Sequence, residues 1–84
     1  MPKITVFTQP DSLPCEAVKL FLKHRGAKFE ERNVARDQDA VRDLRDKYHS
    51  HSTPTLVIDG QVLVGFDPER IDEMLDGFSK NRSA

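Results

Sequence analysis

The chain has 84 residues and one cysteine, and its 13 Lys and Arg residues nearly balance its 14 Asp and Glu residues. This length fits one small domain over residues 1–84, and a lone cysteine excludes an internal disulfide as its support. The formal net charge of -1 gives no sign of a nucleic-acid or anionic-membrane partner. No apolar run approaches a membrane span and no signal-peptide core precedes the first strand, so we expect a cytoplasmic protein with a reduced cysteine.

The first part of the chain predicts a strand, a helix and a weaker strand. Residues Lys3–Thr8 are rich in β-branched and aromatic side chains, which favours a strand. Ser12 is a candidate N-cap, Pro14 fits the first turn, and Gly26 fits the left-handed position after the last turn, so we predict a helix over residues 13–25. The segment Lys28–Val34 carries few apolar side chains and predicts a short edge strand.

The middle of the chain predicts a second helix and a hairpin. Val41, Leu44 and Tyr48 recur at helical spacing, which indicates a helix from about residue 37 to 48, followed by a polar loop over residues 49–52. Residues 55–58 and 61–64 flank the dipeptide Asp59-Gly60, which is typical of a tight turn between two paired strands.

A third helix closes the chain. Asp67 fits its N-cap and Pro68 its first position. Its apolar stripe consists of Ile71, Met74, Leu75 and Phe78. We expect the polar residues 79–84 to form a frayed tail.

The element order β-α-β-α-β-β-α predicts an α/β fold. Its first β-α-β unit implies two parallel strands with a right-handed crossover, and the hairpin adds an antiparallel pair. The expected architecture is therefore a mixed four-stranded sheet with three helices. The first and third helices are the most apolar, so we expect them to cover the sheet.

Three segments carry a resemblance to a known family: Thr5–Asp11, Thr53–Thr55 and Gly65–Asp67. Because these segments come in the family's order and on the same elements, the chain resembles the glutaredoxin branch of the thioredoxin superfamily over residues 3–78. It looks most like the small bacterial glutaredoxin-like proteins of the NrdH type. The resemblance implies a thioredoxin fold and thiol–disulfide exchange with protein or glutathione disulfides, as part of electron transfer in redox homeostasis.

The family's redox motif is Cys-x-x-Cys at the start of the first helix, and here it is Ser12-Leu13-Pro14-Cys15. The resemblance places Ser12 at the nucleophile position and Cys15 at the resolving position. A helix N-terminus stabilises a thiolate, whereas a serine hydroxyl is not ionised near neutral pH and forms no counterpart of a disulfide. We therefore predict that the chain lacks the dithiol activity. The resemblance implies that the thiol of Cys15 is shielded, so we expect Cys15 to pack as a small hydrophobe.

Three interpretations of Ser12 stay open. It could be a helix cap alone, because serine is among the preferred capping residues. It could be a replacement, natural or designed, of a cysteine by its near-isosteric analogue. It could also activate glutathione, as a serine does at the corresponding place in some glutathione transferases, although those enzymes complete the pocket with a second helical domain.

The resemblance also implies a substrate-binding set. The bond before Pro54 is expected to be cis, which directs the backbone N–H and C=O of Thr53 at the substrate. Gly65, Phe66 and Asp67 are expected to bind the γ-glutamyl end of glutathione at the start of the last helix. Leu13 and Pro14 complete the set.

Two departures from the family weaken the case for glutathione. Gln9 stands where some glutathione-using relatives have Lys, and His51 stands where some have Arg. They leave room for a thioredoxin-reductase-type donor or a peptide partner. We expect a monomer that holds no metal and no bound cofactor, with glutathione as a candidate co-substrate. His49 and His51 are interpreted as residues of a solvated loop. A non-catalytic module that binds a peptide or glutathione in the same groove is the alternative function, and glutathione conjugation through the Ser12 hydroxyl is a weaker one.

Overall fold

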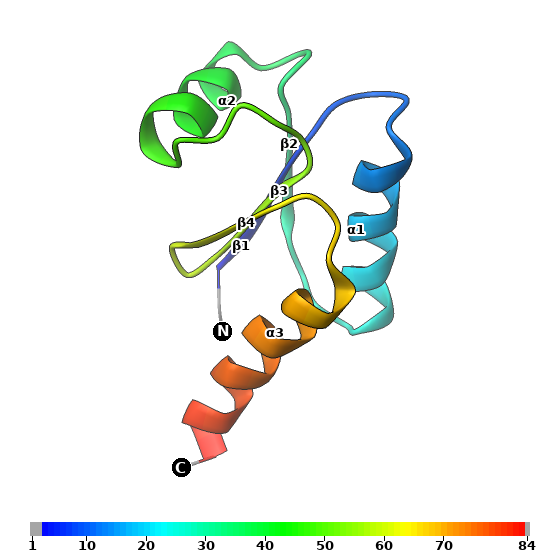
Figure 1. Cartoon of the computed structure of the whole chain (residues 1–84), viewed down its shortest axis with the longest axis vertical. Helices are drawn as coiled ribbons and strands as arrows, with labels where there is room; N and C mark the ends of the chain where they lie inside the picture. Colours follow the sequence, from blue (N-terminus) through cyan, green and yellow to red (C-terminus); the bar gives the residue numbers. More distant parts are fainter. Residues whose placement is uncertain (1–2, 84) are drawn as a thin grey trace.

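The computed structural model describes residues 3–83, with side chains in the last helix up to residue 76. Its elements run in the predicted order, and their bounds are β1 (Ile4–Thr8), α1 (Leu13–His24), β2 (Glu30–Asn33), α2 (Gln38–Arg42), the π-helical turn η1 (Asp43–Lys47), β3 (Thr55–Ile58), β4 (Gln61–Val64) and α3 (Pro68–Ser83) (Figure 1). None of the helices within residues 3–83 has the length and apolar content needed to cross a membrane.

The four strands form one mixed sheet in the order β2-β1-β3-β4. β1 pairs in parallel with β2, and both the β1–β3 and β3–β4 pairs are antiparallel. Asp59 and Gly60 take positive φ angles of 47° and 86°, which suits the tight turn between β3 and β4. The predicted α/β fold with a mixed four-stranded sheet is confirmed.

The core has one layer on each face of the sheet. α1 and α3 pack on one face, where Val18, Leu22, Ile71 and Met74 meet the strand residues Ile4, Val6, Leu56 and Ile58. The opposite face is covered by α2 and η1, where Ala40 and Leu44 meet Phe7 and Val57. The expectation that α1 and α3 cover the sheet therefore holds for one face only, because alternate side chains of a strand point to opposite faces and both faces are apolar.

The second helix differs from its expected form. The α-helix ends at Arg42, and the backbone continues as a π-helical turn in which the N–H of Tyr48 donates to the carbonyl of Asp43 at 3.1 Å. Arg32 of β2 donates to Asp43 at 2.6 Å, which ties this turn to the sheet. Val41 is consequently exposed while Ala40 is buried, so the stripe of Val41, Leu44 and Tyr48 does not face the core as one set.

Side-chain caps fix where the helices begin. The Oγ of Ser12 accepts the N–H of Cys15 at 3.3 Å, and Asp67 Oδ1 accepts the N–H of Arg70 at 3.2 Å. Gly26, with φ 67°, follows α1 as expected. α3 runs to Ser83, and the frayed tail expected over residues 79–84 stays a prediction. The side chain of Phe78 and residue Ala84 lie outside the described part.

Candidate functional site

The N-terminus of α1 carries the two residues that the resemblance singles out. Ser12 is half-buried with an extended backbone, and its hydroxyl lies against the first-turn N–H of Cys15. Leu13, the next residue, is 85% exposed. A nucleophile at position 12 would therefore sit at the surface and face N–H groups that the helix leaves without backbone partners.

Cys15 is a free cysteine with only 1% of its surface exposed. It lies one helical turn after Ser12, and Val18 follows on the same side of α1 as another fully buried residue. The sulfur is thus shielded by the protein, as expected for a resolving thiol or for a small buried hydrophobe. The burial alone fits both interpretations.

A short loop positions Pro54 beside this helix. The Thr53–Pro54 peptide bond is cis, as the resemblance implies. The carbonyl of Pro54 accepts the N–H of Gly65 at 2.8 Å, which joins the loop before β3 to the turn before α3. Together with the start of α1, these segments, which are far apart in the sequence, line one cavity.

These segments form an open cavity of about 520 Å³, which we call the apolar groove. Six of the seven expected substrate-binding residues line it, and Asp67 instead caps α3. Ala17 also lines the groove and was not expected from the sequence, although its place one turn after Pro14 could have indicated it. The lining residues are Leu13, Pro14, Ala17, Thr53, Pro54, Gly65 and Phe66.

Aromatic contacts hold one wall of the apolar groove. The ring of Phe66 packs edge-on against Phe21 of α1, with 5.9 Å between the ring centroids. The guanidinium of Arg25 stacks over the Phe21 ring, 3.8 Å from the ring centroid. The same guanidinium forms a two-point ion pair with Asp72 of α3. These contacts link the groove wall to both helices of this layer.

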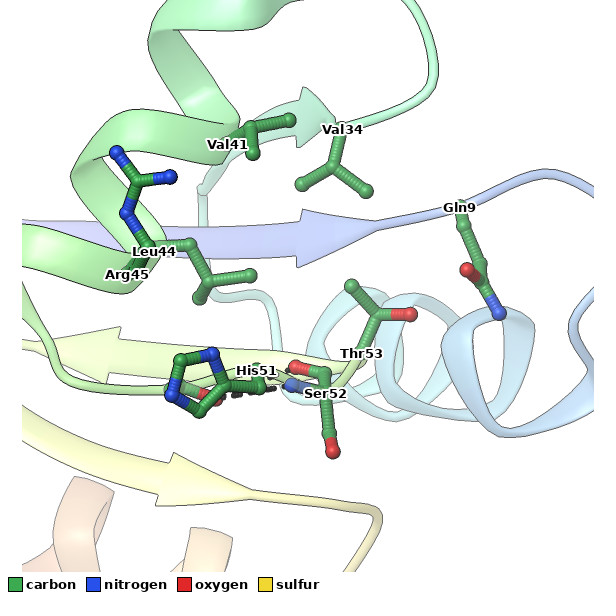
Figure 2. Close-up of a pocket in the computed structure, with 9 residues that line it drawn as sticks. Gln9, Val34, Val41, Leu44, Arg45, His51, Ser52 and Thr53 are labelled. Atoms are coloured by element: carbon green, nitrogen blue, oxygen red, sulfur yellow. Dashed lines mark hydrogen bonds between the residues drawn. The ribbon is translucent and has the colours of Figure 1, made fainter.

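Thr53 also lines a second cavity, of about 450 Å³ (Figure 2). We call it the α2-side cavity. It brings together Gln9 and His51, the two positions that the resemblance marks as departures from some members of the family. Its lining residues are Gln9, Val34, Val41, Leu44, Arg45, Ser50, His51, Ser52 and Thr53.

Buried hydroxyl groups hold the loop between the two cavities. The hydroxyl of Thr55 donates to the carbonyl of Ser52 at 2.6 Å, and the Ser50 and Thr55 hydroxyl oxygens lie 2.8 Å apart. Ser50 and Thr55 are both buried. These bonds leave both hydroxyl groups satisfied and fix the chain just before Thr53.

A charged network lies behind the start of α1. The buried Thr8 donates to Glu31 at 2.8 Å, and Lys19 bridges Glu31 and Glu16. The hydroxyl of Thr8 and then the ammonium of Lys19 hold the pKa of Glu31 below its ordinary value. This network joins β1, β2 and α1.

Comparisons with known proteins agree with this arrangement. The glutaredoxin family model matches residues 4–63. The solved thioredoxin-like protein BC3987 is 49% identical, with a TM-score of 0.83 over 86% of this chain and 99% of that one. NrdH-redoxin from Escherichia coli, a glutaredoxin-like protein with a thioredoxin-like activity profile, is 31% identical, with a TM-score of 0.76 over 84% of this chain and 92% of that one.

A curated relative covers the chain in the same way. The uncharacterized glutaredoxin-like 8.6 kDa protein from the rubredoxin operon of Clostridium pasteurianum is 29% identical over 73 residues, which make up 87% of this chain and 97% of that protein. The family match spans most of the chain, and the fold and element order agree with it. The chain is therefore a member of the glutaredoxin family, within the thioredoxin superfamily.

Proposed function

We propose that this chain carries the disulfide-exchange site of a small glutaredoxin-like reductase, with Ser12 at the position of the nucleophilic thiol. The observation that carries the proposal is the placement of Ser12 at the N-cap of α1, with Cys15 buried one turn later and the apolar groove beside both. A thiolate at this N-cap would be stabilised by the Cys15 N–H, which now donates its hydrogen bond to the Ser12 hydroxyl.

With a thiol at position 12, the exchange is a two-step reaction. The thiolate attacks a substrate disulfide, forms a mixed disulfide and releases one substrate thiolate. The Cys15 sulfur then attacks the mixed disulfide, which releases the second substrate thiolate and leaves a disulfide between positions 12 and 15. The substrate gains two electrons, and an external donor, a thioredoxin-reductase-type enzyme or glutathione, restores the protein. With Ser12 the first step cannot occur, so the chain lacks this turnover.

The lining of the apolar groove favours a protein disulfide as the substrate. None of its seven lining residues is charged, and Leu13 at its edge is almost fully exposed. Glutathione carries two carboxylates and an ammonium, and such a surface offers these charges no partner of opposite sign. A protein disulfide flanked by apolar side chains would cover Leu13 and Phe66 on binding.

The absence of a thiol at position 12 favours a second function, a non-catalytic binding module. The groove is formed without any contribution from that thiol, and the backbone of Thr53 can pair with an extended peptide as one added strand. Glutathione conjugation through the Ser12 hydroxyl is the weakest option, because the described lining of the groove offers no charged group to the carboxylates and ammonium of glutathione.

A trapping experiment tests the assigned roles. The double variant Ser12→Cys, Cys15→Ser should form a stable mixed disulfide with a protein disulfide substrate, because nothing in the chain can resolve it. Mass spectrometry identifies the adduct and its position. The unaltered chain is the matched control and should form no adduct through position 15, because that sulfur is shielded. An adduct on Cys15 of the unaltered chain, or none on the double variant, would contradict the proposal.

A further inference from the structure

The α2-side cavity has an apolar wall that the exchange reaction does not use. Val34, Val41 and Leu44 stand around the hollow in Figure 2, with Thr53 facing them from the opposite side. Gln9, His51 and Ser52 supply polar groups around the rest of it. An aliphatic wall with a few polar groups suits a side chain that is mostly hydrocarbon.

The charges around this cavity favour an uncharged guest. Among the described residues that line it, Arg45 is the only Lys or Arg, and none is acidic. The guanidinium of Arg45 is already held by Asp46 through two hydrogen bonds, Nε to Oδ1 at 2.8 Å and Nη2 to Oδ2 at 3.3 Å. A guest carboxylate would have to compete with Asp46 for this guanidinium.

Thr53 connects the α2-side cavity to the apolar groove, because it lines both. The buried hydroxyl bonds of Ser50 and Thr55 hold the loop that carries it. An extended peptide that paired with the Thr53 backbone would therefore lie next to both cavities. Side chains two residues apart in such a peptide lie on the same face, about 7 Å from each other.

We infer that the α2-side cavity is a subsite for an uncharged aliphatic side chain of an extended peptide, two residues from the cysteine that lies in the apolar groove. This inference rests on the proposed function, since it places that cysteine beside Ser12. It makes the cavity a determinant of which protein disulfides the site accepts.

Peptide binding to the full chain, with Ser12 and Cys15 unaltered, tests this subsite without any redox step. The probes are blocked peptides that carry S-methylcysteine and, two residues away on each side, Leu, Ala or Asp. Amide chemical shifts of the isotope-labelled chain report both the affinity and the site. We expect the Leu peptide to bind about fivefold more tightly than the Ala or Asp peptides, and to shift amides of Val34 and Arg45 together with Thr53.

Two valine variants provide the matched control. Val41 and Val62 are 42% and 41% exposed, and only the first lines the cavity. Val41→Gln should reduce the preference for Leu below twofold, whereas Val62→Gln should keep it. Equal affinities for the three peptides, shifts confined to the apolar groove, or no binding at all would overturn the subsite. The trapping experiment judges the exchange site separately, because it requires no aliphatic residue near the substrate cysteine.

Discussion

At the scale of single residues, the proposed function depends most on position 12. The Ser12 side chain accepts the first-turn N–H of Cys15, so it occupies the place where a helix N-terminus acts on a charge. In this structure the serine side chain caps α1 through this contact. The effect of the helix N-terminus on a charge at this position can be measured as the pKa of a thiol placed there.

The double variant Ser12→Cys, Cys15→Ser has one thiol, and its pKa should lie well below the ordinary value of about 8.5. The reason is that the thiolate gains the N–H contact and the favourable helix dipole, while position 12 is only half-buried. Ultraviolet absorbance of the thiolate against pH gives the value. A pKa at or above the ordinary one would mean that α1 does not activate this position.

At the scale of elements, local signals explain most of what the sequence could predict. The β3–β4 hairpin has the predicted bounds, because Asp59-Gly60 encodes its turn without help from the rest of the chain. The π-helical turn was missed because Val41, Leu44 and Tyr48 satisfy the spacing of an ordinary helix. What distinguishes the turn is the bond from the Tyr48 N–H to the Asp43 carbonyl, and the spacing of apolar residues does not indicate this bond.

Glu31 joins three elements, and its contribution to stability should depend on pH. Its folded pKa is lowered from 4.5, chiefly by the Thr8 hydroxyl and then by Lys19. A lowered folded pKa means that the stabilisation is present above the unfolded pKa and is lost as the pH falls through the folded one. Glu31→Gln should therefore lower the free energy of unfolding near neutral pH, and the difference from the unaltered chain should vanish at strongly acidic pH.

Denaturant unfolding at several pH values measures this effect, with Glu30→Gln as the control from the neighbouring exposed position on β2. We expect the control to change stability little at any pH. If the loss of unfolding free energy in Glu31→Gln stays constant down to strongly acidic pH, Thr8 and Lys19 do not stabilise the carboxylate charge.

At the scale of the whole molecule, the two faces of the sheet explain what the sequence could not predict. The element order predicts a mixed sheet, but which helix covers which face depends on long-range packing. The α2-side cavity was missed for the same reason, because Gln9, Val34 and Thr53 come from three separate loops. The residues of the apolar groove were expected from the family resemblance and not from periodicity, and their binding role stays a prediction.

The central strand β3 should carry much of the folding free energy. Leu56 is fully buried in the layer formed with α1 and α3, whereas Leu20 on α1 is 57% exposed. Leu56→Ala should lower the free energy of unfolding by about 2–5 kcal/mol, while Leu20→Ala should change it by about 0.5 kcal/mol or less. Denaturant titrations of the two variants make the comparison. Similar losses of unfolding free energy in Leu56→Ala and Leu20→Ala would contradict the assignment of the core.

We propose that Ser12 alone keeps this site from exchanging disulfides, and reductase turnover by Ser12→Cys beside the unaltered chain tests this proposal. Turnover is measured with a protein disulfide and with a glutathione mixed disulfide, each with an excess of external reductant. We predict that the variant turns over the protein disulfide, with less activity on the glutathione substrate, and that the unaltered chain turns over neither. A variant that stays inert on both substrates while it keeps the fold would contradict the account.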